Sequence, residues 1–152
     1  VIASNGTPSN GPVNVRIEGG TFNCGIVSGG YLACGVFVAQ CGNWDIVGGT
    51  FNMMSDKATA FVVRSGNVNI DLDNVTVNMN ASASDSIGKV GDSTFVKSGH
   101  VVAAYYTSGA YGFTEDSTSL IINGESKISS ENVLNYVGTN SAVQVNVCYY
   151  DN

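Results

Sequence analysis

Apolar and polar residues alternate over short stretches along the chain, and Gly or Asn separates one stretch from the next. In residues 13–17, for example, Val13, Val15 and Ile17 alternate with Asn14 and Arg16. This period of two predicts strands of three to six residues that bury one face. Val and Ile together number 30, whereas Leu and Met together number 7. Because β-branched side chains favour strands over helices, we expect a nearly all-β protein.

The chain also repeats itself. The segment VRIEGGTFN at 15–23 returns as WDIVGGTFN at 44–52, and VFVAQCGNWDI at 36–46 matches AFVVRSGNVNI at 60–70. A third copy, LDNVTVN, follows at 72–78. The matches indicate a repeat of about 24–29 residues.

Two later segments continue the pattern in weaker form. Residues 120–128, LIINGESKI, keep an alternating apolar run, and SAVQVNV at 141–147 resembles the opening strand GPVNVRI at 11–17. The chain therefore holds four full repeats and a fraction of a fifth.

A repeat of about 25 residues buries its apolar face only by stacking on its neighbours, which predicts a parallel β-solenoid. A sandwich would need antiparallel hairpins with Asn-Gly or Asp-Gly turns, and such turns are scarce between the runs. Stacked repeats place equivalent residues in columns with a spacing of about 4.8 Å. The expected columns are Thr21, Thr50 and Thr76; Phe22, Phe51 and Val77; Asn23, Asn52 and Asn78; and Arg16, Asp45 and Asn69. Gly19 with Gly48, and Gly20 with Gly49, are expected at the corners.

With its two GGTFN copies and its CGN and SGN segments, the chain resembles the right-handed parallel β-helix proteins of bacterial and phage surfaces with GGTF-type repeats. The resemblance covers roughly residues 13–147. It implies a right-handed β-solenoid of about 4–5 turns, with about 24–29 residues per turn, over residues 13–152, preceded by a polar N-terminal extension at 1–12. The family includes polysaccharide lyases, adhesins, phage tailspikes and filament-forming surface proteins, so the fold does not select one activity.

Charge narrows the classes of partner. The formal net charge is −6, and only 12% of the residues are charged. The six basic residues are scattered singly, so no basic stripe can neutralise a nucleic acid backbone. No apolar run reaches the 18 or so residues that a membrane span needs. Three sequons, at Asn5, Asn74 and Asn80, are glycosylation candidates and favour an extracellular or cell-surface location.

The four cysteines also suggest an oxidising compartment, because their spacing offers no metal site. Cys34 and Cys41 flank a run that, if straight, separates them by about 23 Å, too far for a disulfide. Cys24 and Cys34, on either side of a Gly-rich turn, are a feasible pair. Cys41 and Cys148 are expected about three stacked repeats, or roughly 14 Å, apart, which excludes a bridge between them within one chain. We therefore expect disulfides, some of them between chains.

Two groups of residues have the chemistry of a catalytic site. Asp71 and Asp73 alternate onto one outer face, where paired carboxylates could bind Ca²⁺ or act on a sugar chain. The alignment places no carboxylate in the same column, so a solvated strand face is the preferred interpretation. His100 is the only histidine, and without a GxSxG turn it is interpreted as a corner residue. We predict no catalytic residue, metal or cofactor.

The aromatic residues are interpreted in two ways. Trp44 aligns with Val15 and Val68, which predicts an inward or corner position rather than a sugar-stacking platform. A second group of aromatic residues is too large for a single alternating strand face to bury, and it is expected to form an exposed patch. It comprises Tyr105, Tyr106, Tyr111, Phe113, Tyr149 and Tyr150. The Thr column is not expected to bind ice, because its neighbouring columns carry Asn and Phe.

The expected function is structural: a non-catalytic extracellular protein whose copies stack end to end into a filament. The partner is a further copy of the chain, with surface glycans as a second class of partner. Apolar triplets of the same spacing at the two ends are the expected interface: Val13, Val15 and Ile17, and Val143, Val145 and Val147. The alternatives are a glycan-binding or glycan-cleaving β-helix module and a fragment of an adhesin or phage tailspike.

Overall fold

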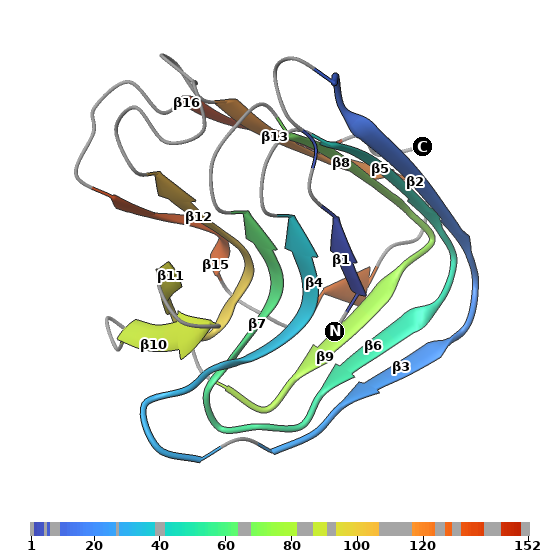
Figure 1. Cartoon of the computed structure of the whole chain (residues 1–152). Coiled ribbons are helices and arrows are strands. Elements are labelled where there is room, and N and C mark those ends of the chain that lie inside the picture. The colour runs from blue at the N-terminus through green and yellow to red at the C-terminus, as the bar shows by residue number, and fades with distance from the viewer. Residues whose placement is uncertain are drawn as a thin grey trace.

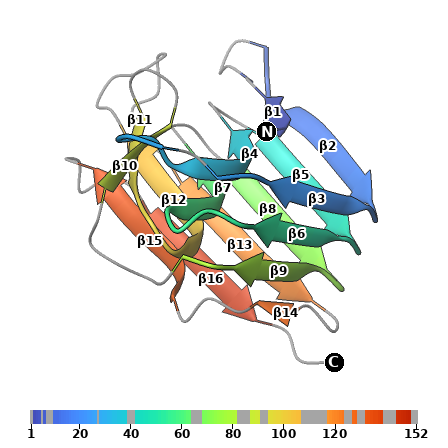
Figure 2. The same ribbon diagram turned by 90° about the horizontal axis from the view of Figure 1, so that it is seen from below.

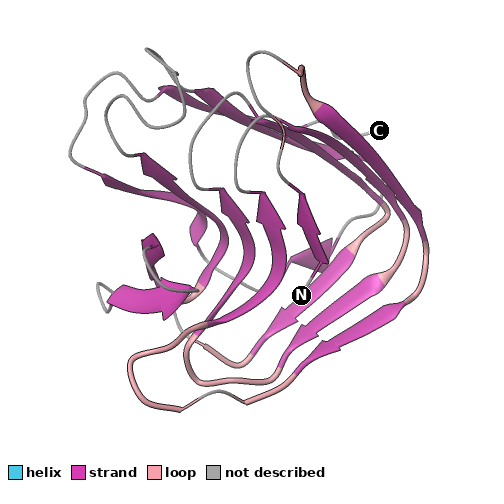
Figure 3. Cartoon of the chain, viewed as in Figure 1, coloured by secondary structure: helices cyan, strands magenta, loops and turns pink. Residues whose placement is uncertain are grey.

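The computed structural model describes residues 2–4, 6, 10–26, 28–38, 42–63, 68–81, 87–90, 94–106, 117–123, 127–128, 132–138 and 144–149. The described residues form strands, turns and loops and no helix, as Figure 3 shows. The strands are β1 (Ile2–Ser4), β2 (Val13–Glu18), β3 (Thr21–Cys24), β4 (Ala33–Val38), β5 (Gly42–Val47), β6 (Thr50–Met53), β7 (Ala58–Val63), β8 (Val68–Asp73), β9 (Thr76–Met79), β10 (Ile87–Val90), β11 (Thr94–Lys97), β12 (His100–Tyr106), β13 (Ser117–Asn123), β14 (Lys127–Ile128), β15 (Asn132–Gly138) and β16 (Gln144–Tyr149). The prediction of an all-β protein is confirmed.

Three parallel sheets take the strands in strict rotation (Figure 1). Sheet A has the order β1-β4-β7-β12-β15, sheet C the order β2-β5-β8-β13-β16, and sheet D the order β3-β6-β9-β14. Apart from the hairpin β10–β11, the chain therefore visits sheets A, C and D in turn. We call each such pass a rung; β1, β2 and β3 form the first rung. Figure 2 shows the rungs following one another from the N-terminal to the C-terminal side. Because β1 lies within the expected extension 1–12, sheet A begins before Val13.

The predicted GGTFN columns are confirmed. Thr21 pairs with Thr50 and Thr50 with Thr76, while Phe22 pairs with Phe51 and Phe51 with Val77. The Asn column forms in the same way. Its hydrogen-bonded neighbours are separated in sequence by 29 and then 26 residues, in agreement with the expected repeat.

The longer match between 36–46 and 60–70 predicts the wrong register. It aligns Phe37 with Phe61 and Ile46 with Ile70, whereas Phe37 pairs with Val62 and Ile46 with Leu72. As a result Asp45 pairs with Asp71, not with Asn69, and Trp44 pairs with Ile70, not with Val68. The physical reason is that the corners differ in length, so the sequence separation between paired residues differs between sheet A and sheet C.

Sheet A departs from simple alternation at a bend. Ala60 and Phe61 on β7 are consecutive and both belong to the main core, as do Val101 and Val102 on β12. At the matching place on β4, a Cβ on Gly35 would lie 3.4 Å from the ring of Phe51, and the next residue, Val36, is also in the core. Two inward residues in succession curve the strand around the core, as the arrows of β4, β7 and β12 show in Figure 1.

The hairpin β10–β11 packs outside sheet A and was not predicted. Its strands pair antiparallel, and β11 lies beside β12 and β15. A second apolar cluster lies on this outer face, with Leu32, Cys34, Val62 and Ala103 buried and Val90 of the hairpin packed against them.

The hairpin also changes the spacing of the rungs along the chain. The N–H of Ala58, at the start of β7, donates to the hydroxyl of Ser98 just before β12, although the two residues are 40 apart in sequence. The expected repeat length is therefore wrong between the third and fourth rungs, because the hairpin is inserted there.

Candidate functional site

The first rung has an edge that no described strand covers. β2 and β3 end their sheets, and their inward side chains Val13, Val15, Ile17 and Phe22 are only half-buried. The equivalent residues of the second rung are buried: Trp44 is 2% exposed, and Ile46 and Phe51 are 0% exposed. We call this edge, with the inward side chains of β2 and β3, the open rung.

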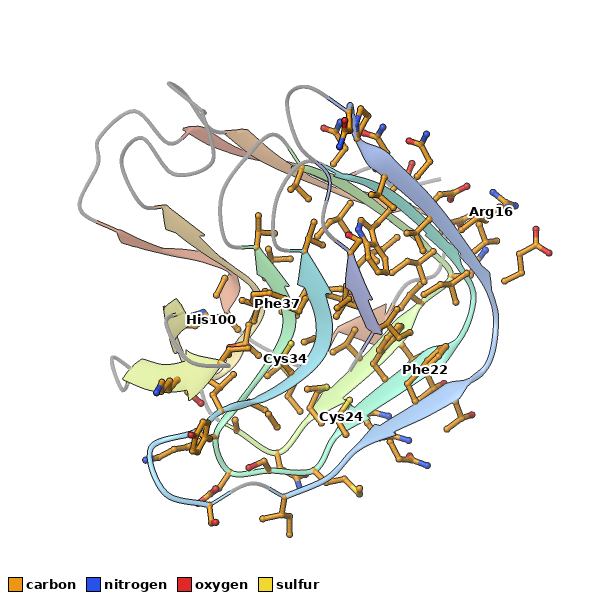
Figure 4. All side chains as sticks on the ribbon, in the orientation of Figure 1. Arg16, Phe22, Cys24, Cys34, Phe37 and His100 are labelled. Atoms are coloured by element: carbon orange, nitrogen blue, oxygen red, sulfur yellow. The ribbon has the colours of Figure 1, made fainter. Side chains whose placement is uncertain are left out.

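An aromatic stack runs inward from the open rung. The rings of Phe22 and Phe51 lie 4.6 Å apart between centroids, with an angle of 17° between their planes. Phe61 continues the contact from sheet A, with its centroid 5.3 Å from that of Phe51. Phe22 points to the interior from β3 in Figure 4 but is less buried than Phe51. The stack therefore ends in an apolar surface at the open rung.

Two asparagine ladders follow the outer faces of sheets C and D. In sheet C the Nδ2 of Asn43 donates to the Oδ1 of Asn14 at 2.8 Å, and the Nδ2 of Asn69 donates to the Oδ1 of Asn43 at 2.9 Å. The ladder of Asn23, Asn52 and Asn78 in sheet D has the same direction, with distances of 2.8 and 2.9 Å. In both ladders the amides therefore donate toward the open rung.

A charged group lies beside the first ladder. The Nε of Arg16 donates to Glu18 at 2.7 Å, and its Nη1 donates to Asp45 in the next rung. The hydrogen bond to Glu18, and then the charge of Asp45, raise the pKa of Arg16 above its usual value. The expectation that Asp71 has no carboxylate in its column is wrong, because its column holds Asp45 and Arg16. Val47 and Glu18 occupy the column of Asp73.

Cys24 and Cys34 carry free thiols, so the expected bridge between them is absent. Cys24 packs against the main core inside the sheets, whereas Cys34 belongs to the cluster outside sheet A. Because Cys24 faces the interior and Cys34 faces outward from sheet A, the two side chains do not form a disulfide. Burial raises the pKa of the Cys34 thiol to about 12. Cys41 lies outside the described residues, and Cys148 is placed only by the backbone of β16.

The other singled-out residues lie apart from the open rung. His100 begins β12 directly after a bend, and it is buried in the column of Thr59 and Cys34 under the hairpin, where Figure 4 labels it. Trp44 is inward, as predicted, and its burial excludes it as a sugar-stacking platform. Asn74 and Asn80 are exposed corner residues.

The remaining aromatic and sequon predictions involve residues whose side chains the structure does not describe. Tyr105 and Tyr106 are placed by the backbone of β12, and Tyr149 by that of β16. Asn5, Tyr111, Phe113 and Tyr150 lie outside the described residues.

The opposite edge of sheet C is β16, and its register corrects the expected equivalence of the two end triplets. Following the pairs through β5, β8 and β13 places Val145 in the column of Val13 and Val147 in the column of Val15. The sequence alignment had Val143 opposite Val13, two residues out, and Val143 lies outside the described residues. A shift of two keeps the same face inward, which is why alternation alone does not detect it.

Sequence reasoning missed one contact around the hairpin. Residues 30–32 run alongside β10, with the backbone N–H of Leu32 donating to the carbonyl of Lys89 at 2.9 Å. The ammonium of Lys89 lies 5.7 Å from the centroid of the Tyr31 ring. Residues 87–90, IGKV, do not alternate with a period of two, so no local pattern in the sequence indicates this strand.

Comparison with known proteins gave no match to any protein-family model, to any curated protein or to any solved structure. Among the described residues, no three or more His, Cys, Asp or Glu side chains gather in a way that could hold a metal ion. The same part of the chain has no helix that is long and apolar enough to cross a membrane.

Proposed function

We propose that this chain is a right-handed β-solenoid of four to five turns whose copies stack end to end into an extracellular filament or surface fibre without catalytic activity. The open rung carries this proposal. Its apolar side chains are half-buried, and the backbone edges of β2 and β3 have no described partner. An edge of this kind is a template for pairing with another strand.

The rotation of the chain through sheets A, C and D supports the solenoid. Each of the first four passes adds one strand to each sheet, which is how solenoid repeats stack. The resemblance to the β-helix surface proteins with GGTF-type repeats agrees with this arrangement, and that family is the proposed one for this chain.

A contact between opposite ends of two copies is heterologous, because it joins two different surfaces. Such a contact does not close on itself, and repetition produces a filament rather than a dimer. The two ends of sheet C match in direction and column, since all its strands are parallel. A second copy therefore extends the sheet without turning over.

The extracellular assignment rests on composition, on the four cysteines and on the three sequons, of which the structure describes those at Asn74 and Asn80. Asn74 and Asn80 are both exposed, so a glycan at either corner would extend into solvent. Asn74 also has a left-handed backbone, with φ of 54°, which places it at a tight corner between β8 and β9.

The test compares two lysine substitutions within the first rung. Val15→Lys puts a charge among the half-buried apolar residues of β2, whereas the control Thr21→Lys adds the same charge on the exposed face of β3. Electron microscopy at neutral pH should show fibres for the unmodified chain and for the Thr21 variant, and none for the Val15 variant. Circular dichroism checks that each variant monomer is folded. Unchanged fibres from a folded Val15 variant would refute stacking at the open rung.

A glycan-binding or glycan-cleaving module is the second candidate, favoured by one observation. The outer face of sheet C brings Glu18, Asp45, Asp71 and Asp73 onto neighbouring positions of three strands. Glycan arrays and reducing-sugar assays with the unmodified chain and with Asp71→Asn test this candidate. Binding or cleavage that Asp71→Asn abolishes would support it.

A further inference from the structure

The first and last strands of sheet C carry the same tripeptide at the same place in the register. Val13-Asn14-Val15 lies on β2, and Val145-Asn146-Val147 lies on β16. The strand pairs across β5, β8 and β13 align these tripeptides residue by residue. The outermost strands at the two ends of the sheet are thus equivalent in both sequence and column.

The direction of the ladder makes the two ends chemically complementary. The Oδ1 of Asn14 accepts from Asn43, so the Nδ2 of Asn14 is left on the side of the open rung. Within the described part of the chain, no residue accepts a hydrogen bond from this Nδ2. A strand that docks on β2 with an acceptor in the column of Asn14 would pair this Nδ2 directly.

We propose that β16 of one copy docks on β2 of the next in parallel, with Val145, Asn146 and Val147 opposite Val13, Asn14 and Val15. The Nδ2 of Asn14 then donates to Asn146 of the second copy, and the ladder continues across the contact. This inference rests on the proposed function, because it specifies the register of the end-to-end contact.

The ladder favours this register over its neighbours, because only here does an Asn of β16 lie opposite Asn14. A shift of two residues keeps the apolar residues on the inner side but places Gln144 or Cys148 opposite Asn14. In the proposed register Cys148 is opposite Arg16, whereas the register suggested by Val143 opposite Val13 places Cys148 opposite Glu18. Each register therefore brings Cys148 to a different residue of β2.

Cysteine crosslinking reads out this difference. Directly opposed residues of adjacent parallel strands have Cα atoms about 4.8 Å apart, within the range of a disulfide, and residues displaced by two are about 8 Å apart. Fibres of Arg16→Cys and of Glu18→Cys are treated with diamide and separated on non-reducing gels. The unmodified chain and the same variants with Cys148→Ser are the controls, and peptide mass spectrometry identifies the bridge.

We expect Arg16→Cys to give a bridge to Cys148 between chains and Glu18→Cys to give none. A bridge from Glu18→Cys instead would overturn the register. Fibres in which neither variant crosslinks to Cys148 would also overturn the proposed register, while leaving end-to-end assembly standing. Absence of fibres from the unmodified chain would refute the proposed function itself, and this inference with it.

A second measurement tests the hydrogen bond. Asn14→Asp removes the Nδ2 donor but keeps an oxygen that accepts from Asn43. Asn23→Asp makes the same change in sheet D, where the described strands number four and none belongs to the last rung. Loss of one hydrogen bond should raise the critical concentration for assembly about fivefold in Asn14→Asp. Asn23→Asp should change it by less than about twofold. Equal increases in the critical concentration would assign the effect to the added charge. No increase in Asn14→Asp would show that the ladder does not continue across the contact.

Discussion

Trp44 occupies space that Gly42 leaves free two residues earlier on the same strand. A Cβ on Gly42 would lie 3.2 Å from the indole Nε1 of Trp44 and 3.3 Å from a methyl group of Val38. The first and third rungs carry Val13 and Val68 in the column of Gly42. The second rung therefore combines a small and a large residue where the first combines two valines.

Gly42→Ala should destabilise the protein by about 1–2 kcal/mol, because the buried indole must move to admit the methyl group. Urea unfolding followed by circular dichroism measures the change. Gly25→Ala is the matched control, since a Cβ there meets nothing within 4 Å. A loss equal to that of the control would show that the indole is not tightly held.

The corner after each strand of sheet C predicts a second substitution effect. Gly19, Gly48 and Asn74 follow β2, β5 and β8 with φ values of 77°, 74° and 54°. Gly48→Ala should cost about 1 kcal/mol from the left-handed backbone alone, because its Cβ would meet only ordinary contacts. Gly48→Asn should cost less, since Asn already holds this corner in the third rung. Thermal unfolding compares the two, and an equal loss would contradict the backbone explanation.

The position of an asparagine within its ladder should determine how much stability is lost when that asparagine is replaced. Asn52 both donates to Asn23 and accepts from Asn78, whereas Asn23, at the end of the described ladder, only accepts. Asn52→Ala should therefore lose about 1–2 kcal/mol and Asn23→Ala about half of that. Equilibrium unfolding of each variant monomer at low concentration measures the two losses. Equal losses would show that the number of ladder hydrogen bonds removed does not set the loss of stability.

The buried thiol of Cys34 predicts a dependence of stability on pH. Its pKa rises from 9.0 to about 12 on folding because burial disfavours the thiolate. Between these values the unfolded chain has lost a proton that the folded chain keeps, so stability falls as pH rises, by about 1.4 kcal/mol per pH unit for one group. Below pH 9 this contribution to pH dependence disappears.

The comparison that isolates this group is the unmodified chain against Cys34→Ala, unfolded in urea at several pH values from 8 to 11. The difference in unfolding free energy between the two should shrink as pH rises. Iodoacetamide at pH 8 should also leave Cys34 unmodified until the chain is denatured. Parallel pH profiles would show that the thiol is hydrated in the folded state.

Salt should promote the proposed assembly, because each copy carries a net charge of −6. Copies of like charge repel until ions screen them, and the screening length falls to about 10 Å at 0.1 M salt. Light scattering should therefore show faster fibre growth in sodium chloride than in low-salt buffer. An equal osmolarity of sucrose is the control, and slower growth in salt would indicate that attractive ion pairs dominate the contact.

The predictable part of the fold lies where identical residues recur at a fixed place. The GGTFN copies aligned Thr21 with Thr50 and Asn23 with Asn52 correctly, because consecutive identical residues allow one register only. The match that joined Ile46 to Ile70 failed, because it crossed corners of unequal length. At the open rung, the sequence identified Val13, Val15 and Ile17 as inward residues, but the placement of the opposite end required the pairs through β13.

By itself the sequence determined that the chain is built of short parallel strands, because alternation defines a buried face and repetition defines what that face packs against. The tertiary structure alone decided whether each residue of sheet A faces the interior or the outside. Cys34 and Val36 are two residues apart yet lie in different clusters, since the bend places two inward residues in succession. It also decided that the hairpin β10–β11 covers Val62 and Ala103, a contact between distant segments that no local pattern records.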